Sequence, residues 1–492
     1  MLYTVHQAEQ TDYTERICRI TERYIFDMTG DKTNTASQHT DRRRSTFSGK
    51  LGYVLAVAGS AVGLGNIWRF PYLAAKYGGG IFLLTYLILM LTFGYALIVS
   101  ETALGRMTKR SPVGAFQIFG KKLPLKFGGW VNAVIPMLIV PYYSVIGGWV
   151  IKYLFEYLRG NSQTLAQDDY FTGFISGGFS AELWFLVFSL VVIVVLFAGV
   201  KHGVERVSKV MMPLLVILAV FVAGYSMTRP GALEGVKYFL IPNFDNFSWM
   251  TVVAAMGQMF YSLSIAMGIL YTYGSYMKKE VDIEQSTTQV EIFDTAIAML
   301  AGLMIIPAVF AFSGGDPDTL QAGPSLMFIT IPKVFASMGF GTGAGIMFFL
   351  LVLLAALTSA ISLAESGVST FEDQLGIGRH KATVLMGIIM ILFGSVSALG
   401  FGVLDFVKLL GMSILDFFDF LTNSLMMPIA ALATCLLVTR VAGLNKIIDE
   451  VEQSSEFKRK KMYCFFMKYL APVCIVIILL SSIANVFGWI TM

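Results

Sequence analysis

Three hydrophobic stretches of this sequence carry oxygen-bearing or helix-breaking residues where lipid would favour leucine or valine. The segment GSAVGLGNIWRFPY (59–72) contains three glycines, an asparagine, an arginine and a proline, and QVEIFDTAIAMLAG (289–302) contains Asp294. In the third stretch, Thr358 and Ser359 are adjacent hydroxyl residues. An unwound helix exposes carbonyl oxygens, and carbonyl, hydroxyl and carboxylate oxygens are the hard ligands that replace water around a small cation. These stretches therefore contain the groups that an alkali-cation site needs.

Each feature also has an ordinary structural explanation. A Thr–Ser pair inside a helix commonly bonds back to the preceding turn, and glycine-rich helices pack closely through their small residues. A carboxylate at mid-membrane costs roughly 2.5–3.5 kcal/mol even on a lenient insertion scale, so Asp294 should face a partner. That partner could be a structural hydrogen bond as well as a cation, and from the residues alone both explanations stay open.

The composition of the chain is that of a polytopic membrane protein. Of its 492 residues 56% are hydrophobic and only 14% are charged, and the mean hydropathy is +0.69. A soluble protein of this length needs more polar surface. The net charge of +4 argues against a nucleic-acid partner, which requires a clustered basic face. The four cysteines show no CxxC spacing, and there is no P-loop, HExxH or paired-aspartate pattern, so we expect no disulfide, no ATP site and no enzyme.

Apolar runs of about 20 residues predict helices that cross the hydrocarbon core of a membrane. We expect eleven, near residues 51–75, 80–105, 128–157, 182–200, 207–227, 249–275, 288–312, 341–371, 381–399, 403–440 and 465–490. Lys and Arg are concentrated in alternate loops. The positive-inside rule then predicts a cytosolic N-terminus and an extracellular or periplasmic C-terminus in the plasma (inner) membrane. The loop 313–340 is apolar but punctuated by Gly and Pro, which favours a re-entrant or lid-like hairpin.

Two of the predicted spans are weak at their centres. The first breaks around Ser60–Asn66, and the sixth has a weak centre at Ser264–Gly268. A helix breaks at mid-depth only where it lines a protein cavity, because backbone groups in hydrocarbon must be hydrogen-bonded. Two broken spans five helices apart predict two five-helix halves of opposite topology with a binding site at the breaks. The predicted parts are a cytosolic N-terminal tail (1–45), two five-helix repeats (46–227 and 228–440), and a cytosolic loop with the eleventh span (441–492).

Several motifs make a family resemblance specific. They are GSAVGLGNIWRFPY, GGGIFLLTY (78–86), ETALGR (101–106), the tyrosine pair at 142–143, GQMFYSLS (257–264), QAGPSLMF (321–328) and LTSAIS (357–362). From residue 44 to about 430 the chain resembles the neurotransmitter:sodium symporter family, itself the standard example of inverted repeats with discontinuous helices. The resemblance implies an all-α polytopic membrane protein with a LeuT-type 5+5 inverted repeat, broken helices 1 and 6, and eleven transmembrane helices.

The resemblance also implies two sodium sites. Sodium site 1 would comprise Ala61, Asn66, Ser262 and Asp294 with a substrate carboxylate, and sodium site 2 would comprise Gly59, Val62, Ala355, Thr358 and Ser359. Many animal relatives carry Asn at the position of Asp294, and chloride-dependent members carry Ser four residues later, where this chain has Ala298. Because Asp294 supplies a permanent negative charge, we expect no chloride requirement.

The implied substrate is an amino acid. Gly63 stands where monoamine transporters of the family carry Asp, so the substrate should bring its own carboxylate. The substrate-binding residues would be Ser60, Ala61, Leu64, Gly65, Ile139, Tyr143, Tyr261, Ser264, Ala266, Met267, Ser359 and Leu363. None of them is charged, which favours a hydrophobic or aromatic side chain.

Two gates are implied by the same resemblance. Arg69 and Asp419 would form the outer gate, and Arg44, Phe47, Tyr276 and Asp373 the inner one, with Phe47 where many relatives have Trp. The expected function is a sodium-coupled symporter in the lipid bilayer that imports such amino acids by alternating access. The alternatives are a carrier of another small zwitterion, of the betaine or proline type, and an amino-acid sensor that binds without transport. The resemblance leaves the oligomeric state open.

Overall fold

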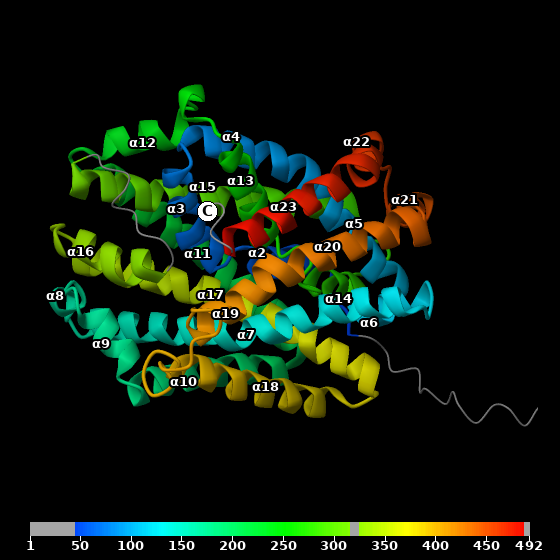
Figure 1. Ribbon diagram of the computed structural model, residues 1–492, viewed down its shortest axis with the longest axis horizontal. Helices are drawn as coiled ribbons and strands as arrows, with labels where there is room; N and C mark the ends of the chain where they lie inside the picture. Colours follow the sequence, from blue (N-terminus) through cyan, green and yellow to red (C-terminus); the bar gives the residue numbers. More distant parts are fainter. Residues whose placement is uncertain (1–44, 315–323, 487–492) are drawn as a thin grey trace, which may run out of the picture. The chain divides into compact units, whose positions relative to one another are not determined.

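Long apolar helices make up the described part of the chain, residues 45–314 and 324–486 of the computed structural model (Figure 1). Within that part, nine helices or helix series are long and apolar enough to cross a membrane: Gly80–Thr108 (α4, η2, α5), Leu123–Leu158 (α7), Phe179–Phe197 (α10), Val200–Met227 (η3, α11), Ile283–Ser313 (α15), Gly341–Leu375 (α17), Arg379–Leu399 (α18), Ile414–Ala442 (α19, η7, α20, η8) and Lys460–Ala484 (α22, η9, α23). Within the composite spans, the α-helices are α4 (Gly80–Leu89), α5 (Tyr95–Thr108), α11 (Glu205–Met227), α19 (Ile414–Asp419), α20 (Met427–Leu436), α22 (Lys460–Phe465) and α23 (Ala471–Val486). The π-helical turns are η2 (Met90–Gly94), η3 (Val200–Val204), η7 (Phe420–Met426), η8 (Leu437–Ala442) and η9 (Phe466–Leu470).

Two broken spans complete this set. The first consists of α2 (Lys50–Ala61) followed by η1 (Gly65–Arg69) and α3 (Phe70–Lys76), with a bend of 53° between the parts. The second consists of α13 (Trp249–Ser262) and α14 (Ile269–Tyr276). They occupy the first and sixth positions, so the described residues provide the spans that the sequence predicts. The predicted N-terminal tail lies outside the described residues up to residue 44.

The first span breaks where its sequence is rich in glycine. α2 ends at Ala61, Val62 is extended (φ −76°, ψ 95°), and the helix resumes as a π-helical turn at Gly65. Pro71 lies inside the resumed helix Gly65–Lys76, directly after the π-helical turn, and its missing N–H leaves one helical hydrogen bond unmade. The break therefore lies within the predicted segment Ser60–Asn66.

The sixth span breaks between α13 and α14 in a strained segment. Ser264 (φ 54°), Ala266 (φ 60°) and Gly268 (φ 69°) all have left-handed backbone conformations, which cost about 1–2 kcal/mol for a residue with a Cβ. The buried Glu101 carboxylate accepts a hydrogen bond from the Ala266 amide at 3.0 Å. Tertiary contacts therefore hold this strained conformation, and the predicted weak centre is the observed break.

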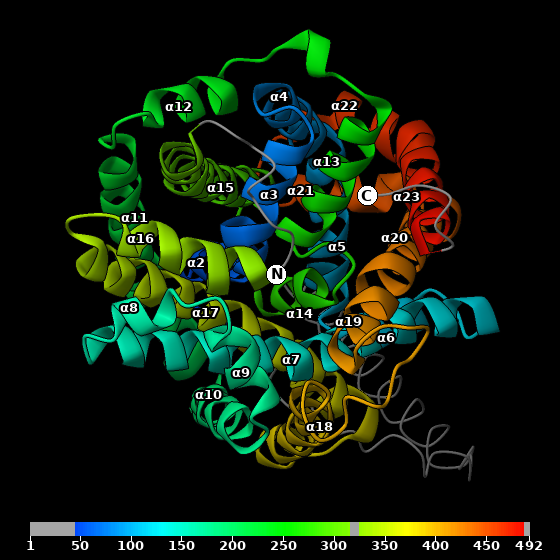
Figure 2. The same ribbon diagram turned by 60° about the vertical axis from the view of Figure 1, so that its left-hand side comes forward.

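The first broken span lies in the interior of the helical unit. α2 packs against α11, α15 and α17 and also contacts α14, and Figure 2 shows it among these helices. Every residue of α2 from Gly52 to Ala61 is buried, as expected for a helix that is hydrophobic all round. α7 packs against α17, α10 and α18. The break is therefore surrounded by protein, where unwound backbone is tolerated.

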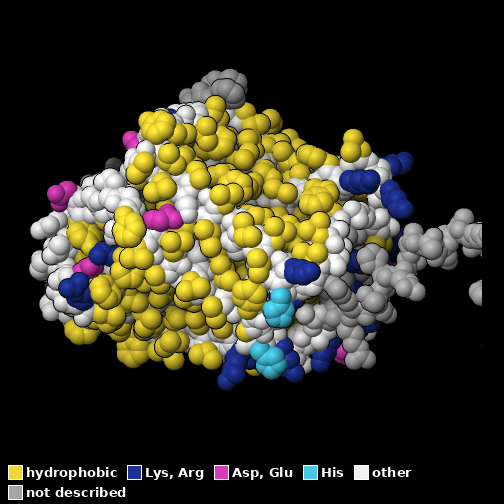
Figure 3. Space-filling view, turned by 90° about the horizontal axis from the view of Figure 1, so that it is seen from below, with side chains coloured by type: hydrophobic (Ala, Val, Ile, Leu, Met, Phe, Trp, Pro, Cys, Tyr) yellow, Lys and Arg dark blue, Asp and Glu magenta, His cyan; other side chains and the backbone are white. Residues whose placement is uncertain are grey.

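Hydrophobic side chains cover much of the outer surface. Figure 3 shows a broad hydrophobic face, with Lys, Arg and His side chains gathered toward the right-hand end, where Figure 1 places α6 (Pro112–Ile118), α21 (Leu444–Glu452) and α22. Leu190, Phe221 and Leu392 are each more than half exposed. Such a surface fits the hydrocarbon of a bilayer, so the chain is a multi-pass membrane protein.

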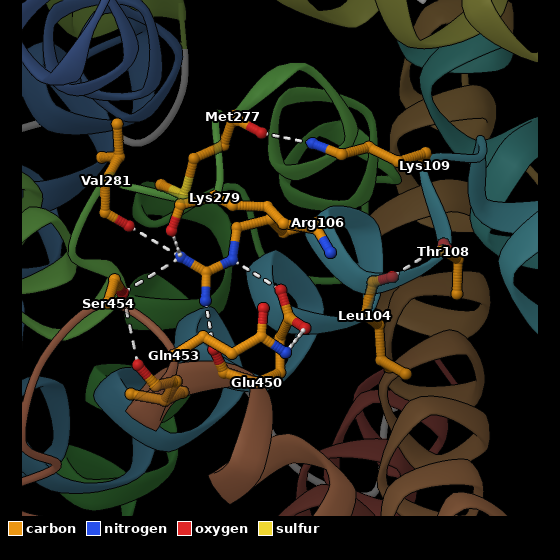
Figure 4. Close-up of polar contacts among 11 residues, drawn as sticks. Leu104, Arg106, Thr108, Lys109, Met277, Lys279, Val281, Glu450, Gln453 and Ser454 are labelled. Atoms are coloured by element: carbon orange, nitrogen blue, oxygen red, sulfur yellow. Dashed lines mark hydrogen bonds and ion pairs between the residues drawn. The ribbon is translucent and has the colours of Figure 1, made fainter. Parts of the chain in front are cut away.

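A buried arginine fixes the connection between the tenth and eleventh spans. Arg106, near the end of α5, is fully buried, and its Nε lies 2.6 Å from Glu450 Oε1 on α21. Its Nη1 donates to the Val281 carbonyl at 2.7 Å and its Nη2 donates to the Glu450 carbonyl (Figure 4). A buried ion pair is tolerated when further hydrogen bonds satisfy both partners. Arg106 thus ties α5 to α21 and to the turn that follows α14.

Two connections differ from regular spans. Residues 400–413 form turns with backbone hydrogen bonds between Leu409 and Met412, and α19 begins at Ile414. The long predicted run 403–440 is thus an approach segment followed by a span. In the loop 313–340, residues 315–323 lie outside the described residues. The helix Leu326–Ala336 that follows (η6 and α16) is too short to cross the hydrocarbon core.

Candidate functional site

Ser359 on α17 lies against the unwound end of α2. Its hydroxyl oxygen is 3.3 Å from the Gly59 carbonyl oxygen, 3.1 Å from that of Ser60 and 3.3 Å from that of Val62. A hydroxyl group has one hydrogen and can donate it to only one of these carbonyls. The other carbonyl oxygens receive no hydrogen from Ser359, and carbonyl oxygens that converge in this way form a suitable ligand set for a hard cation.

Thr358 and Ala355 are close to the same place. Thr358 Oγ1 lies 3.0 Å from the Leu354 carbonyl and 3.1 Å from the Ala355 carbonyl, which is ordinary helix back-bonding. Back-bonding uses the hydroxyl hydrogen and leaves oxygen lone pairs available. A Cβ built on Gly59 would lie 3.2 Å from Thr358 Cβ, so α2 and α17 are in close contact. The structure brings together the residues predicted for sodium site 2.

Asp294 on α15 is completely buried beside both breaks. Its Oδ1 accepts hydrogen bonds from Asn66 Nδ2 and Ser262 Oγ, each at 2.8 Å, and its Oδ2 accepts one from Tyr86 Oη at 2.8 Å. Asn66 belongs to η1, Ser262 ends α13, and Tyr86 lies on α4. These contacts unite three residues predicted for sodium site 1, and the fourth, Ala61, lines the adjacent cavity.

The charge of Asp294 is balanced by no Lys or Arg among the described residues. Its three donors are a side-chain amide and two hydroxyl groups. An isolated carboxylate at this depth is unfavourable unless a cation binds beside it. The described residues contain no group of three or more His, Cys, Asp or Glu side chains that could hold a metal ion. The carboxylate of Asp294 and the hydroxyl oxygen of Ser262 are hard ligands, which suit sodium better than a transition metal.

A small cavity lies between the two breaks. It is lined by the predicted substrate-binding residues except Ala266, and also by Gly63, Asn66 and Ile269. Its volume is about 20 Å³, roughly the space that one water molecule needs. Tyr143 Oη accepts a hydrogen bond from the Leu64 amide at 3.1 Å. The cavity is therefore too small in this structure for an amino acid.

Glycines allow the first break to approach its neighbours. A Cβ on Gly63 would lie 2.7 Å from Ser359 Oγ and 3.0 Å from Tyr143 Oη. A Cβ on Gly65 would lie 2.4 Å from the Tyr261 ring. A side chain at position 63 would therefore require the Ser359 and Tyr143 hydroxyl groups to move.

The break in the sixth span presents Ser264 to the cavity but not Ala266. Ser264 Oγ lies 3.1 Å from Ser60 Oγ and 3.2 Å from the Ser60 carbonyl oxygen, and these contacts join the two breaks. Ala266 is fully buried, with its amide bound to Glu101. Ala266 does not line the cavity in this structure, and the left-handed turn directs its amide to α5.

Three polar residues around the breaks are absent from the predicted site. They are Tyr86, Glu101 and Gln258, of which Gln258 donates from Nε2 to the Gly65 carbonyl at 3.0 Å. Each lies in a motif that carries the family resemblance, namely GGGIFLLTY, ETALGR and GQMFYSLS. Their presence in these motifs is the sequence signal that could have identified them.

A larger cavity of about 350 Å³ lies next to the first, and Arg69 and Asp419 both line it. The Arg69 guanidinium lies 5.3 Å from the centre of the Tyr261 ring. Asp419 Oδ1 instead accepts hydrogen bonds from Asn423 Nδ2 at 2.6 Å and from Tyr142 Oη at 3.2 Å. Although both belong to the described residues, Arg69 and Asp419 form no ion pair here, and Tyr261 lines both cavities.

Aromatic residues close the other end of the broken spans. Phe47 is buried and makes edge-to-face contacts with Tyr53, Tyr273 and Tyr276 at centroid distances of 5.4–6.0 Å. Tyr276 Oη donates a hydrogen bond to Glu365 on α17 at 2.7 Å. Phe47 therefore fills its place in a packed cluster without the larger indole ring.

Charged residues surround this aromatic cluster. Glu365 pairs with Arg379 at 2.6 Å, and neither was singled out from the sequence. Asp373 accepts a hydrogen bond from the Ser111 amide. Arg44, predicted to belong to the same gate, lies outside the described residues.

Comparisons with known proteins identify similar chains. The model of a family described as the sodium:neurotransmitter symporter family matches residues 44–168 and 175–489. An uncharacterized sodium-dependent transporter of Bacillus subtilis (strain 168), YhdH, is 34% identical over 449 residues, which cover 90% of this chain and 99% of that protein. The sodium- and chloride-dependent GABA transporter 2 of Rattus norvegicus is 28% identical over 492 residues, covering 89% of this chain and 80% of the transporter.

A solved structure shares the architecture. The crystal structure of MhsT in complex with L-phenylalanine matches with a TM-score of 0.81 and 36% sequence identity, covering 89% of this chain and 100% of that chain. The helical fold with broken first and sixth spans, predicted from the sequence, is thereby confirmed.

Proposed function

Because the chain belongs to the sodium:neurotransmitter symporter family, we propose that this sodium-dependent symporter imports hydrophobic or aromatic L-amino acids. The observation that carries the proposal is the meeting of two oxygen clusters, around Asp294 and around Ser359, at one cavity between the broken spans. L-Phenylalanine is the ligand of the similar MhsT, which supports an amino acid as the substrate.

The carboxylate of the substrate would bind at the first break. The amides of Leu64 and Gly65 begin the second half of that span, and a helix N-terminus favours an anion. Tyr143 Oη now accepts the Leu64 N–H, and its own hydrogen is available to a carboxylate. Because Gly63 carries no carboxylate, the substrate itself would supply the negative charge beside Ala61.

The side chain of the substrate would lie among apolar groups. Ile139, Met267 and Leu363 line the cavity together with Tyr261. A charged side chain would lose its hydration there without gaining a partner. The small cavity must enlarge for a phenyl ring, and Met267 is flexible enough to move aside. Ser264 and the carbonyl of Tyr261 would receive the ammonium group.

Two sodium ions would accompany each substrate. Site 1 would use Ala61, Asn66, Ser262 and Asp294, and site 2 would use Gly59, Val62, Ala355, Thr358 and Ser359. A cation that crosses 100 mV contributes about 2.3 kcal/mol, and a tenfold gradient contributes about 1.4 kcal/mol more. Two ions could therefore support roughly 10⁵-fold accumulation of a zwitterion, whereas one ion gives several hundredfold.

We further propose that chloride is not needed. Asp294 carries a fixed negative charge at site 1, and Ala298 offers no hydroxyl to an anion. The carboxylate already accepts the hydrogen bonds of Tyr86 and Ser262. Added chloride would therefore find these donors occupied and would meet a like charge.

Alternating access would use the two ends of the broken spans. Arg69 and Asp419 would approach one another to close the outer cavity, while Phe47, Tyr276 and Asp373 would separate with Arg44 at the inner end. The basic end at α6, α21 and α22 would face the cytosol by the positive-inside rule. Movement of one helix bundle against the other suffices for this cycle, and the chain would act as a carrier and not as an enzyme.

A panel of radiolabelled substrates in sodium-driven, chloride-free proteoliposomes tests this proposal. We expect uptake of phenylalanine and other apolar L-amino acids, and little uptake of lysine, glutamate or amines that lack a carboxylate. Uptake of betaine or proline with rejection of phenylalanine would instead identify a carrier of another zwitterion. Sodium-dependent binding without counterflow would identify a sensor.

A further inference from the structure

Basic side chains gather where the third span begins and the tenth span ends. They define what we call the basic surface, namely Lys121, Lys122, Lys126, Arg440 and Lys446. All five are exposed, and none forms an ion pair with another described residue. Single exposed lysines are ordinary, whereas a group of cations without counter-charges produces a positive potential that attracts anions.

The packing of α7 on α20 brings two parts of this surface together. The helices belong to the third and tenth spans and therefore run in opposite directions, and a Cβ built on Gly128 would lie 2.9 Å from Ala433 Cβ. Lys122 is six positions before Gly128, and Arg440 is seven positions after Ala433. Both therefore lie about 10 Å beyond this contact toward the same end of the molecule.

The helix α21 adds a third part. Lys446 Nζ lies 5.6 Å from the centre of the Phe119 ring, which directly follows α6. Figure 1 places α6 and α21 at the same end of the molecule. The basic surface is thus built from the turn before α7, the end of the tenth span and the start of α21, which are far apart in the sequence.

Acidic residues are rare in the segments that form this surface. No Asp or Glu occurs from residue 102 to residue 155 or from residue 420 to residue 448. Asp449 follows Lys446 by one turn, but the two described side chains form no ion pair. Asp373 accepts a hydrogen bond from the Ser111 amide, before the start of α6. The positive charge of the surface is therefore left for an anion outside the chain.

Exposed apolar side chains lie directly beside these cations. Leu123, Phe127 and Trp130 follow one another at helical spacing on α7, and each is at least 41% exposed. Leu436 and Val441 are 46% and 44% exposed at the end of the tenth span. A tryptophan between apolar and basic residues is typical of the boundary between membrane and water. A ligand that fits this surface is both anionic and apolar.

We propose that the basic surface binds an anionic phospholipid, with its phosphate at Lys122 and Arg440 and its acyl chains along Phe127 and Trp130. A guanidinium can hold phosphate through two N–H groups, and lysines act as point charges. Basic pockets between membrane-spanning helices are known to bind such headgroups. The bound lipid would tie the start of α7 to the end of the tenth span. This inference does not rest on the proposed sodium or substrate sites.

The test compares thermal melts of the purified full-length protein in phosphatidylcholine vesicles with and without phosphatidylglycerol. Phosphatidylglycerol should raise the melting temperature of the wild type, and added salt should weaken this effect. Retention of the two lipids by the protein in detergent measures binding directly, and phosphatidylglycerol should be retained in preference. Inorganic phosphate is the control ligand and should not reproduce the stabilisation, because it has no acyl chains.

Removing the charges and removing the apolar contacts should each weaken binding. In Lys121→Gln/Lys122→Gln/Arg440→Gln, the affinity for phosphatidylglycerol should fall at least about tenfold, because each basic residue near an anionic headgroup contributes to binding. In Phe127→Ala/Trp130→Ala the charges remain, but retention of the lipid should also fall, since the acyl chains lose apolar contacts. The replaced side chains are exposed, so both variants should fold.

A matched control removes the same charge elsewhere. Lys201→Gln/Arg206→Gln/Lys381→Gln changes exposed cations at the starts of η3, α11 and α18. These elements begin the fifth and ninth spans, at the same end of the molecule as the start of the third. The control should keep the wild-type response to phosphatidylglycerol, because it leaves the basic surface intact.

Four results would overturn the inference. A wild type that phosphatidylglycerol does not stabilise has no such site. An equal loss in the two triple variants would show a diffuse attraction to the whole charged face. Equal stabilisation by inorganic phosphate, or full retention of the lipid by Phe127→Ala/Trp130→Ala, would show a site for a free anion. All of these measurements are made without sodium and without an amino acid, so they stand apart from the proposed function.

Discussion

Asp294 shows how single residues join the two broken spans. It accepts hydrogen bonds from Asn66 on η1, Ser262 on α13 and Tyr86 on α4, so one carboxylate connects four elements of the sequence. Because all three donors are neutral, the negative charge remains to be balanced by a bound cation. Gly63 contributes by having no side chain, which leaves space beside it for the hydroxyl groups of Ser359 and Tyr143.

Replacing Asp294 tests the charge at site 1. Asp294→Asn removes a buried charge, so the sodium-free protein should melt at a higher temperature than the wild type. The stabilisation by sodium should shrink, with an apparent affinity at least about tenfold weaker, or about 1.4 kcal/mol. Thermal melts across a sodium titration measure both effects. Asp416→Asn, which changes an acid in the outer cavity, should leave both unchanged, and an unaltered sodium response in Asp294→Asn would contradict this role.

Gly63 tests the close contact at the first break. Gly63→Ala would place a Cβ 2.7 Å from Ser359 Oγ, and such overpacking typically costs about 1–3 kcal/mol. We expect uptake of L-phenylalanine to fall at least tenfold in the folded protein. Gly224→Ala is the matched control, because a Cβ there meets nothing within 4 Å. Equal uptake by the two variants would show that the first break has more room than the structure provides.

Among the elements, the break between α13 and α14 depends on its neighbours. Its left-handed residues are unfavourable by themselves, and the Glu101 carboxylate on α5 holds the amide of Ala266 in place. Arg106 likewise fixes the connection after η8, because it pairs with Glu450. Both cases show an irregular segment whose conformation is fixed by a side chain from α5.

The support of the sixth-span break can be removed without introducing bulk. Glu101→Leu leaves the Ala266 amide without an acceptor, which should destabilise the protein by about 1–3 kcal/mol and reduce uptake. Glu101→Gln keeps a carbonyl oxygen in the same place and should lose much less. Thermal melts and uptake assays of the two variants provide the measurement. If Glu101→Leu were as stable and active as Glu101→Gln, another contact would have to hold the break.

The buried ion pair of Arg106 makes a separate prediction. Arg106→Met leaves Glu450 buried without its partner, so the free energy of unfolding should fall by about 3–5 kcal/mol. The double variant Arg106→Met/Glu450→Leu should recover part of this loss. Lys237→Met removes one member of an exposed pair with Glu234 and should change stability by less than about 1 kcal/mol. A similar loss for Arg106→Met and Lys237→Met would contradict the structural role of the buried pair.

Across the whole molecule, local sequence features predicted the spans and breaks better than the distant pairings. Glycine, proline and a carboxylate in apolar runs are local signals, and they located both breaks and Asp294. Tyr86 escaped notice because a tyrosine in an apolar helix is usually a packing residue. The pairs Arg106–Glu450 and Arg459–Glu291 escaped because their members are 344 and 168 positions apart and meet only in the folded protein.

The gates depend on the state of the whole molecule. Arg69 and Asp419 line one cavity but do not pair here, whereas Phe47 and Tyr276 are packed together. A carrier passes through several arrangements of these residues, and one sequence encodes all of them. The separation of Arg69 from Asp419 could therefore not be predicted from the residues alone.

Uptake of L-phenylalanine into proteoliposomes, with external sodium replaced by choline, tests the central claim most directly. The account predicts strong uptake under an inward sodium gradient, loss of uptake in choline, and no change when gluconate replaces chloride. Equal uptake in sodium and choline would contradict the claim that the broken spans bind sodium together with a zwitterion.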